Sequence, residues 1–331
     1  MDSPLLDLEL PRVRIVKGPS LYIKLPRAER IRIARGVPQA IVKVTGFGRG
    51  ARGIGKAMKY ISRNGELPLE KDTGEMIQGL EEQKELIEEW SIDFDDHKRS
   101  RDTAQIVFSM PPGSPIEALK QAVRKTGARA FPDHEWIFGI HQDREHPHAH
   151  MVIKMRGKEK GKKLKLKKAD LFELRSLFAE AAREEGVELA ASPRAARGVG
   201  RKGARQAVQQ IKRKGVRPEV DKQTVKEAIQ ELFKGDWKQK PWEKAMAERT
   251  QLERTAYQQE AVALRQAAEN EPKTEERERM LLDAALLEQY AKRMPRPRTK
   301  REAIKEKMWQ QIQEQRRAKA RNRDRDAGME L

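Results

Sequence analysis

The spacing of apolar residues predicts several short strands in the first half of this chain. Four brief apolar runs, each bounded by glycine, proline or polar turns, are typical of β-strands. They cover residues 41–44, 103–110, 136–141 and 148–155. Only the turn 142–147 separates the last two runs, and so short a connection predicts an antiparallel hairpin.

Helices are predicted between and after these strands. Residues 77–90 place apolar side chains at helical spacing, with acids on the opposite side. A helix is expected to start near Ile54, after the glycine-rich stretch 46–55. Another is expected over 116–126, where a capping box and a proline precede the first turn. A last one is expected over 170–186, between a capping aspartate and a glycine.

The remaining segments differ in composition from this region. Residues 1–38 are basic and interrupted by prolines, which indicates an arm rather than a core. Arg, Gly and Pro around residues 192–203 indicate a domain boundary. Residues 236–327 contain no glycine, which favours helices broken at prolines. We therefore expect a basic N-terminal arm (1–38), a main domain (39–198), a basic linker (199–222) and a charged helical C-terminal region (223–331).

The charge balance indicates a polyanionic partner. The 331 residues include 70 Lys and Arg against 51 Asp and Glu, a formal charge of +19, as expected for nucleic-acid binding. The absence of cysteine excludes disulfides, cysteine zinc sites and thiol nucleophiles. No apolar run approaches the ~20 residues of a membrane span, and the N-terminus lacks a secretory signal pattern, so we expect a cytoplasmic protein without membrane insertion.

The histidines are the most informative residues, because four of the six lie within one stretch of ten. His148 and His150 are two residues apart, so a strand directs both rings to the same face. His141 ends the neighbouring strand and can join them. Three converging neutral imidazoles are typical of a metal site with open positions for water or substrate. Asp143 and Glu145 are candidates to orient a ring through its second nitrogen.

Two other histidine patterns compete with a metal site. Residues 146–152, His-Pro-His-Ala-His-Met-Val, fit the histidine-triad pattern of nucleotide hydrolases and transferases, in which alternate histidines include a nucleophile. That pattern gives no role to His141, Asp143 or a tyrosine, and its members usually lack a strong basic charge. The metallohydrolase pattern His-x-His-x-Asp-His fails because Met151 follows His150. A histidine-triad enzyme remains the alternative.

A glycine-rich loop precedes the first helix of the main domain. Residues 48–53, Gly-Arg-Gly-Ala-Arg-Gly, match the dinucleotide-binding fingerprint. The neighbouring elements do not form parallel strand-helix-strand units, and Arg49 and Arg52 favour an extended phosphate backbone over a single pyrophosphate. We therefore expect this loop to bind DNA phosphate through backbone amides and the two guanidinium groups.

The helix after this loop carries a tyrosine between two different faces. At about 100° per residue, an apolar face opposes a cationic face of Lys56, Lys59 and Arg63, and Tyr60 lies at the border. A tyrosine hydroxyl, with a pKa of about 10, needs a base or a metal-polarised target to act as a nucleophile at neutral pH. Taken alone, Tyr60 is typical of a packing residue. Beside the histidine cluster and the basic charge, it is a candidate nucleophile.

Three stretches, in this order, resemble the motifs of conjugative relaxases of the His-hydrophobe-His superfamily, in particular the MOB-P class. Residues 59–65, Lys-Tyr-Ile-Ser-Arg-Asn-Gly, are similar to the nucleophile motif, with Tyr60 as the catalytic tyrosine. Residues 108–113 are similar to the second motif, whose serine, Ser109 here, contacts DNA near the nick. Residues 141–150 are similar to the third motif, whose histidines hold a divalent cation.

The resemblance implies an α+β fold, with an antiparallel central sheet flanked by helices and a mainly α-helical C-terminal region. It implies site- and strand-specific nicking of DNA at a plasmid origin of transfer. In that reaction Tyr60 attacks the scissile phosphate and forms a 5′-phosphotyrosyl intermediate, and the exchange of one ester for another makes the step reversible.

The same resemblance implies a metal site and a set of partners. The metal would be Mg²⁺ or Mn²⁺, held by His141, His148 and His150, with His146 as a further candidate ligand and Asp143 or Glu145 in support. Imidazole ligands also suit Zn²⁺. Single-stranded DNA is the implied substrate, with accessory relaxosome proteins and a type IV secretion coupling protein as candidate partners and translocation with the DNA to a recipient cell as a further expectation. A non-catalytic basic DNA-binding protein is a second alternative, and the arginine-rich residues 316–325 are a candidate surface for DNA or protein.

Overall fold

The computed structural model shows two compact units. The first combines residues 1–16 and 23–193, and the second combines residues 17–22 and 194–331. Placement is described for residues 15–16, 22–23, 25–94, 100–143, 145–158, 163–199, 206–234 and 240–327. Side chains from residue 316 onward, which include the arginine-rich stretch 316–325, and most of the predicted arm before residue 25 lie outside this description.

The first unit is built on a six-stranded antiparallel sheet with the strand order β3-β6-β8-β7-β4-β5. Its strands are β3 (Ile41–Gly48), β4 (Leu69–Lys71), β5 (Met76–Ile77), β6 (Thr103–Ser109), β7 (Trp136–His141) and β8 (His148–Lys154). Two short strands, β1 (Ile15–Val16) and β2 (Tyr22–Ile23), precede it. The predicted antiparallel hairpin is confirmed, because β7 and β8 pair in register.

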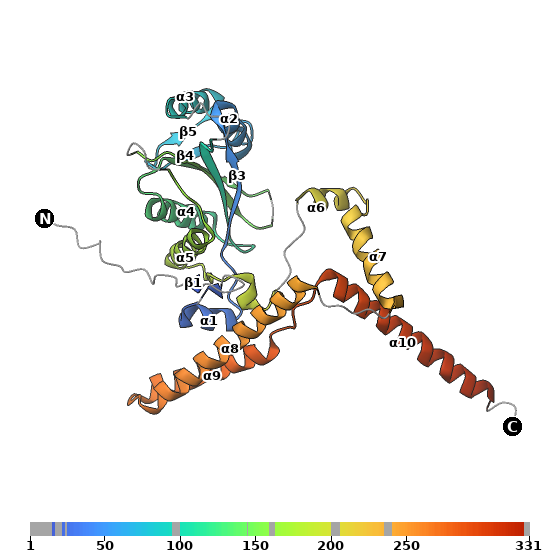
Figure 1. Ribbon diagram of the computed structural model, residues 1–331. Helices are drawn as coiled ribbons and strands as arrows, with labels where there is room; N and C mark the ends of the chain where they lie inside the picture. The colour runs from blue at the N-terminus through green and yellow to red at the C-terminus, as the bar shows by residue number, and fades with distance from the viewer. Residues whose placement is uncertain are drawn as a thin grey trace. The chain divides into compact units, whose positions relative to one another are not determined.

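Helices α4 (Ile116–Ala130) and α5 (Lys168–Glu184) cover one face of this sheet (Figure 1). Alternate strand residues such as Phe108 and Met151 are fully buried in one core cluster with Phe178 of α5. Burial of this apolar area provides the main stabilisation of the first unit, at roughly 25 cal/mol per Å². The residues that alternate with these along each strand point to the other face of the sheet.

Helices α2 (Gly50–Ile61) and α3 (Gly79–Ser91) lie on that other face (Figure 1). Helix α2 begins at Gly50 rather than near Ile54, because the buried carboxylate of Asp102 accepts a hydrogen bond from the Gly50 amide at 2.7 Å. A carboxylate at a helix N-terminus satisfies an amide that the helix itself leaves unpaired. The predicted helix over 77–90 begins later, at Gly79, because Ile77 ends β5.

The second half of the predicted N-terminal arm is folded into the first unit. Helix α1 (Arg27–Ala34) buries Ile33, and the carboxylate of Glu29 accepts a hydrogen bond from the amide of Ala191 at 2.7 Å. A bridge between Gln39 and Ala190 lies beside it. The expectation of an arm over residues 1–38 is therefore wrong for residues 27–34, because their partners lie about 160 positions later in the sequence.

The second unit is helical, as predicted. Its elements are η1 (Arg194–Arg197), α6 (Gln206–Arg213), α7 (Glu219–Lys234), α8 (Pro241–Glu269), α9 (Thr274–Arg293) and α10 (Lys300–Ala327). Two of them, α6 and the start of α7, fall in the predicted linker 199–222. Helices α8 and α9 pack together around buried side chains that include Tyr257 and Leu287. No helix within the described part of the chain is long and apolar enough to cross a membrane.

Candidate metal centre and nucleophile

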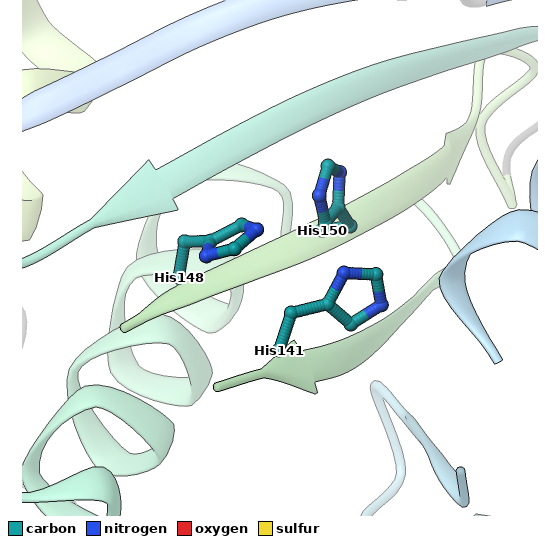
Figure 2. A group of neighbouring side chains, drawn as sticks. All are labelled: His141, His148 and His150. Atoms are coloured by element: carbon teal, nitrogen blue, oxygen red, sulfur yellow. The ribbon is translucent and has the colours of Figure 1, made fainter. Parts of the chain in front are cut away.

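Three histidine rings converge at the end of the β7–β8 hairpin (Figure 2). His148 lies directly opposite His141 in the sheet register, and His150 lies opposite Gly139. The ring centroids are 4.7 Å apart for His141 and His150, 5.1 Å for His148 and His150, and 5.4 Å for His141 and His148. One nitrogen from each ring lies within 4.8 Å of the other two, so a single ion bound between them can reach all three.

Backbone carbonyls fix the orientation of two rings. The Nε2–H of His141 donates to the carbonyl oxygen of Ile61 at 2.8 Å, and the Nδ1–H of His148 donates to the carbonyl oxygen of His146 at 3.1 Å. Because a carbonyl only accepts, each of these nitrogens carries the proton when the ring is neutral. The other nitrogen of each ring then keeps its lone pair, and Nδ1 of His141 is buried without a hydrogen-bond partner among the described residues.

Burial also favours the neutral form of one ring. Burial of His141, with a smaller contribution from the positive charge of Arg63, lowers the pKa of this imidazole below its ordinary value, against the opposing effect of its hydrogen bond to Ile61. A neutral ring with one nitrogen bound to a carbonyl is the form of histidine that ligates metals. The site therefore presents imidazole lone pairs before any ion binds.

The acids predicted to orient these rings have other positions. Asp143 forms an ion pair with Arg63, and Glu145 is exposed, with no hydrogen bond to His141 or His148. Although partial desolvation raises the pKa of the Asp143 carboxyl, the Arg63 guanidinium outweighs it and holds this pKa below its ordinary value. The expectation of carboxylate support is thus wrong for His141 and His148, because nearby backbone carbonyls take that place.

His146 is exposed and lies outside the group of three rings. The histidine-triad pattern would need His146, His148 and His150 to act together. The structure instead groups His148 and His150 with His141, which the triad pattern does not use. This arrangement favours a metal site over a histidine nucleophile.

Tyr60 lies beside the three histidines. The apolar face of α2 is buried on the sheet through Ile54 and Met58, which leaves Tyr60 at the edge of the covered area with 52% of its surface exposed. Its ring centroid is 5.2 Å from that of His150 and 5.9 Å from that of His141. Tyr60 and His141 are 81 positions apart in the sequence, yet the phenol and the imidazoles share one site.

Gly139 allows the helix to approach so closely. A Cβ atom at this position would lie 2.7 Å from the carbonyl oxygen of Ile61 and 2.8 Å from Leu69. Such distances are far inside van der Waals contact, so any other residue would push the end of α2 away from β7. The absent side chain therefore gives His141 its carbonyl partner and brings Tyr60 to the rings.

Cationic side chains surround the exposed side of Tyr60. A pocket of about 320 Å³ is lined by Lys56, Lys59, Tyr60, Arg63 and Asn64. The predicted cationic face of α2 thus borders the candidate nucleophile. Its positive charges are suited to a phosphate next to the phenol.

Arg49 and Arg52 lie at the other end of α2, where the helix begins. Gly50 and Ile61 are the first and last residues of this 12-residue helix, which rises about 1.5 Å per residue. The Gly50 amide is bound to Asp102, so this amide does not offer the predicted phosphate contact. Both arginine side chains are exposed.

The open part of the sheet contributes a serine and a lysine. Ser109 of β6 lies opposite His148, and Val107 lies between Lys43 of β3 and His150 in the next row of the register. Lys43 is exposed and was not among the residues predicted to bind DNA. The sequence does contain a signal for Lys43. It alternates with Val42 and Val44 along the strand and so faces away from the main core.

The part of the chain that contains this site is similar to a relaxase nuclease domain. Residues 60–187 match the family model described as relaxase, MobA/VirD2-like, nuclease domain. The match begins at Tyr60 and contains the three histidines. Residues 60–187 are therefore similar to relaxase nuclease domains, and the predicted resemblance is confirmed for this region.

The curated relatives are T-DNA border endonucleases named VirD2. The protein of Rhizobium radiobacter is 26% identical over 162 residues, which cover 43% of this chain and 38% of the relative. The proteins of Rhizobium rhizogenes and Agrobacterium fabrum are each 27% identical over 162 residues and are covered to 37% and 36%. The chain thus matches less than two fifths of the length of these relatives.

Proposed function

We propose that this protein nicks one strand of DNA at an origin of transfer by transesterification, with Tyr60 as the nucleophile. The observation that carries the proposal is the position of the Tyr60 ring, 5.2 Å from His150 and 5.9 Å from His141 by ring centroids. A phenol beside three metal-ligating rings has the two components that phosphodiester cleavage by tyrosine requires. The relationship to T-DNA border endonucleases supports the same chemistry.

In the proposed step the Tyr60 oxygen attacks the phosphorus and the bond to the 3′ oxygen breaks. The phenolic proton passes to solvent, which reaches this half-exposed side chain, and the leaving 3′ oxygen takes up a proton to become a hydroxyl. The products are a 5′-phosphotyrosyl link and a free 3′ end. Because one phosphodiester replaces another, the reverse attack reseals the strand.

His141, His148 and His150 fit a divalent cation. In the part of the chain that the structure describes, the buried Nδ1 atom of His141 lacks a hydrogen-bond partner, and ligand atoms of all three rings lie within 4.8 Å of one another. A bound cation would withdraw charge from the non-bridging phosphate oxygens. Three imidazoles favour Mn²⁺ or Zn²⁺ by ligand type, and Mg²⁺ is the further candidate.

The residues around Tyr60 would hold the DNA. Lys56, Lys59 and Arg63 line the pocket beside the phenol and would neutralise the phosphates next to the attacked one. Ser109 and Lys43 would contact the strand on the other side of the histidines. Arg49 and Arg52 would contact phosphates further along α2.

Unit 2, outside the matched domain, is proposed to contact accessory relaxosome proteins or a secretion coupling protein. Its charged helices are the surfaces available for such contacts. Cytoplasmic residence and translocation with the nicked strand would follow from the same proposal.

Covalent capture of DNA tests the proposed function. Wild-type protein is incubated with Mn²⁺ and 5′- or 3′-labelled single-stranded fragments of candidate transfer origins, and a denaturing gel detects labelled protein. We expect an adduct that carries only the 3′ label, that chelation prevents and that Tyr60→Phe abolishes while DNA binding persists. An undiminished adduct in Tyr60→Phe would remove Tyr60 from this role. Turnover of a nucleoside phosphoramidate without metal would favour the histidine-triad alternative, and binding without scission under every metal would favour a non-catalytic DNA-binding protein.

A further inference from the structure

Arg63 and Asp143 join the two halves of the candidate site. Arg63 follows α2, and Asp143 lies in the loop between β7 and β8, 80 positions later. The guanidinium Nη2 donates to Oδ2 of Asp143. A cation expected to bind DNA and an acid expected to support the metal are thus paired with each other.

The turn that carries Arg63 has an unusual backbone. Arg63 and Asn64 have φ angles of 54° and 60°, and Gly65 has a φ of 90°. Residues with a Cβ atom rarely adopt this conformation, so the surroundings must hold it. The buried Ser62 hydroxyl does so, since it accepts from the Gly65 amide at 3.0 Å and donates to Gln83 at 3.1 Å.

This turn directs Arg63 back toward the nucleophile. The guanidinium carbon lies 5.8 Å from the centre of the Tyr60 ring, and Arg63 lines the same pocket as Lys56 and Lys59. The cation is therefore next to the place where a phosphate attacked by Tyr60 would lie. In the structure, the carboxylate of Asp143 binds this cation.

A carboxylate and a phosphate present similar oxygen acceptors to a guanidinium group. The Asp143 side chain is 50% exposed and that of Arg63 is 34% exposed, so water can replace either partner and the pair is weak enough to exchange. The hydrogen bonds of Ser62 that hold this turn do not involve Asp143, so the backbone of Arg63 stays beside Tyr60 when Asp143 leaves.

We propose that Asp143 is an internal substitute for a DNA phosphate, which holds Arg63 in position until single-stranded DNA displaces it. Arg63 is then a positioning residue that contacts a phosphate near Tyr60. Asp143 competes with the DNA phosphate for Arg63 and so weakens DNA binding. The bound strand can therefore dissociate more readily. This inference rests on the proposed function.

Binding measured against salt concentration tests the exchange. A labelled single-stranded oligonucleotide is titrated with each variant in EDTA, which prevents cleavage, and fluorescence anisotropy gives the affinity. Asp143→Asn is expected to bind about two- to fivefold more tightly, the range of an exposed ion pair. Arg63→Gln is expected to reduce the slope of log K against log salt by about 0.7, the value for one contact with a single strand. In the Arg63→Gln background, Asp143→Asn is expected to have no effect.

Glu145→Gln is the matched control, because the carboxylate that it removes lies in the same loop but does not pair with Arg63. Urea unfolding of each variant confirms that it is folded. Equal increases in DNA affinity in Asp143→Asn and Glu145→Gln would overturn the exchange. So would an increase by Asp143→Asn that persists in the Arg63→Gln background, or a salt slope that Arg63→Gln leaves unchanged.

The adduct assay separates this proposal from the proposed function. If the wild-type protein forms the adduct but the binding titrations show no coupling between Arg63 and Asp143, only the exchange is overturned. Coupled binding without any adduct supports the exchange and overturns the nicking reaction. Absence of DNA binding by the wild-type protein overturns both.

Discussion

The Nε2–H of His141 donates a hydrogen bond to the carbonyl oxygen of Ile61, 2.8 Å away. Ile61 directly follows Tyr60 in the last turn of α2. A ring of the candidate metal centre is therefore oriented by the backbone that carries the candidate nucleophile. Displacement of this helix end would affect both parts of the site together.

Substitution of Gly139 tests this coupling. Gly139→Ala places a methyl group 2.7 Å from the Ile61 carbonyl oxygen, and we expect a loss of about 1–3 kcal/mol in the free energy of unfolding together with weaker Mn²⁺ binding. Urea unfolding and calorimetry measure the two effects. Gly55→Ala is the control, because its methyl group meets Ile87 at an ordinary 3.6 Å and alanine favours a helix by up to about 1 kcal/mol. Equal behaviour of the two variants would contradict the coupling.

The histidines are expected to differ in their contribution to metal binding. His148→Ala and His150→Ala each remove one imidazole from the group of three, so Mn²⁺ affinity measured by calorimetry should fall at least about tenfold. His146→Ala is the matched control, since this ring is exposed and lies outside the group. A loss of affinity in His146→Ala as large as in the other two variants would assign His146 as a ligand.

The metal-free protein should become less stable below neutral pH. The pKa of His141 is lowered in the folded state, first by burial. Below the ordinary value of 6.5, the unfolded chain therefore binds a proton that the folded state does not. This difference reduces the free energy of unfolding as the pH falls from 6.5 to the lower folded-state pKa, and it is absent above 6.5. Urea midpoints in EDTA between pH 8 and about 5 measure the effect, which His141→Gln should diminish; an undiminished pH dependence in that variant would assign it to other groups.

Lys43 is expected to contact the substrate. Its row of the sheet contains His150, with Val107 between them, so Lys43→Ala should weaken oligonucleotide binding and reduce the salt slope by about 0.7. Lys120→Ala is the control, because Lys120 lies on α4, on the opposite face of the sheet. Anisotropy titrations at several salt concentrations compare the variants. Equal slopes for the wild-type protein and Lys43→Ala would exclude a phosphate contact.

The parts of the fold that depend on local sequence were predictable. Alternation along a strand placed His148 and His150 on one face, and helical spacing placed Tyr60 between an apolar and a cationic face. The short connection at 142–147 required the hairpin that adds His141. Each of these inferences needs only residues that are neighbours in the chain or in the hairpin.

Features that depend on distant partners were not predictable. Helix α2 starts early because of Asp102, 52 positions later, and α1 is folded because Glu29 reaches Ala191. The orientation of His141 by Ile61 joins residues 80 positions apart. A single sequence contains no periodicity that reports such contacts, because the strand order that creates them is a property of the whole sheet.

The 52% exposure of Tyr60 has a topological consequence. A nucleophile at the bottom of a closed tunnel could be reached only by a polymer end threaded through it. A phenol that is open to solvent on one side can instead engage an internal position of a very long chain laid against it from the side. Under the proposed function, a circular DNA molecule, which has no end to thread, would therefore be as accessible to this site as a linear one.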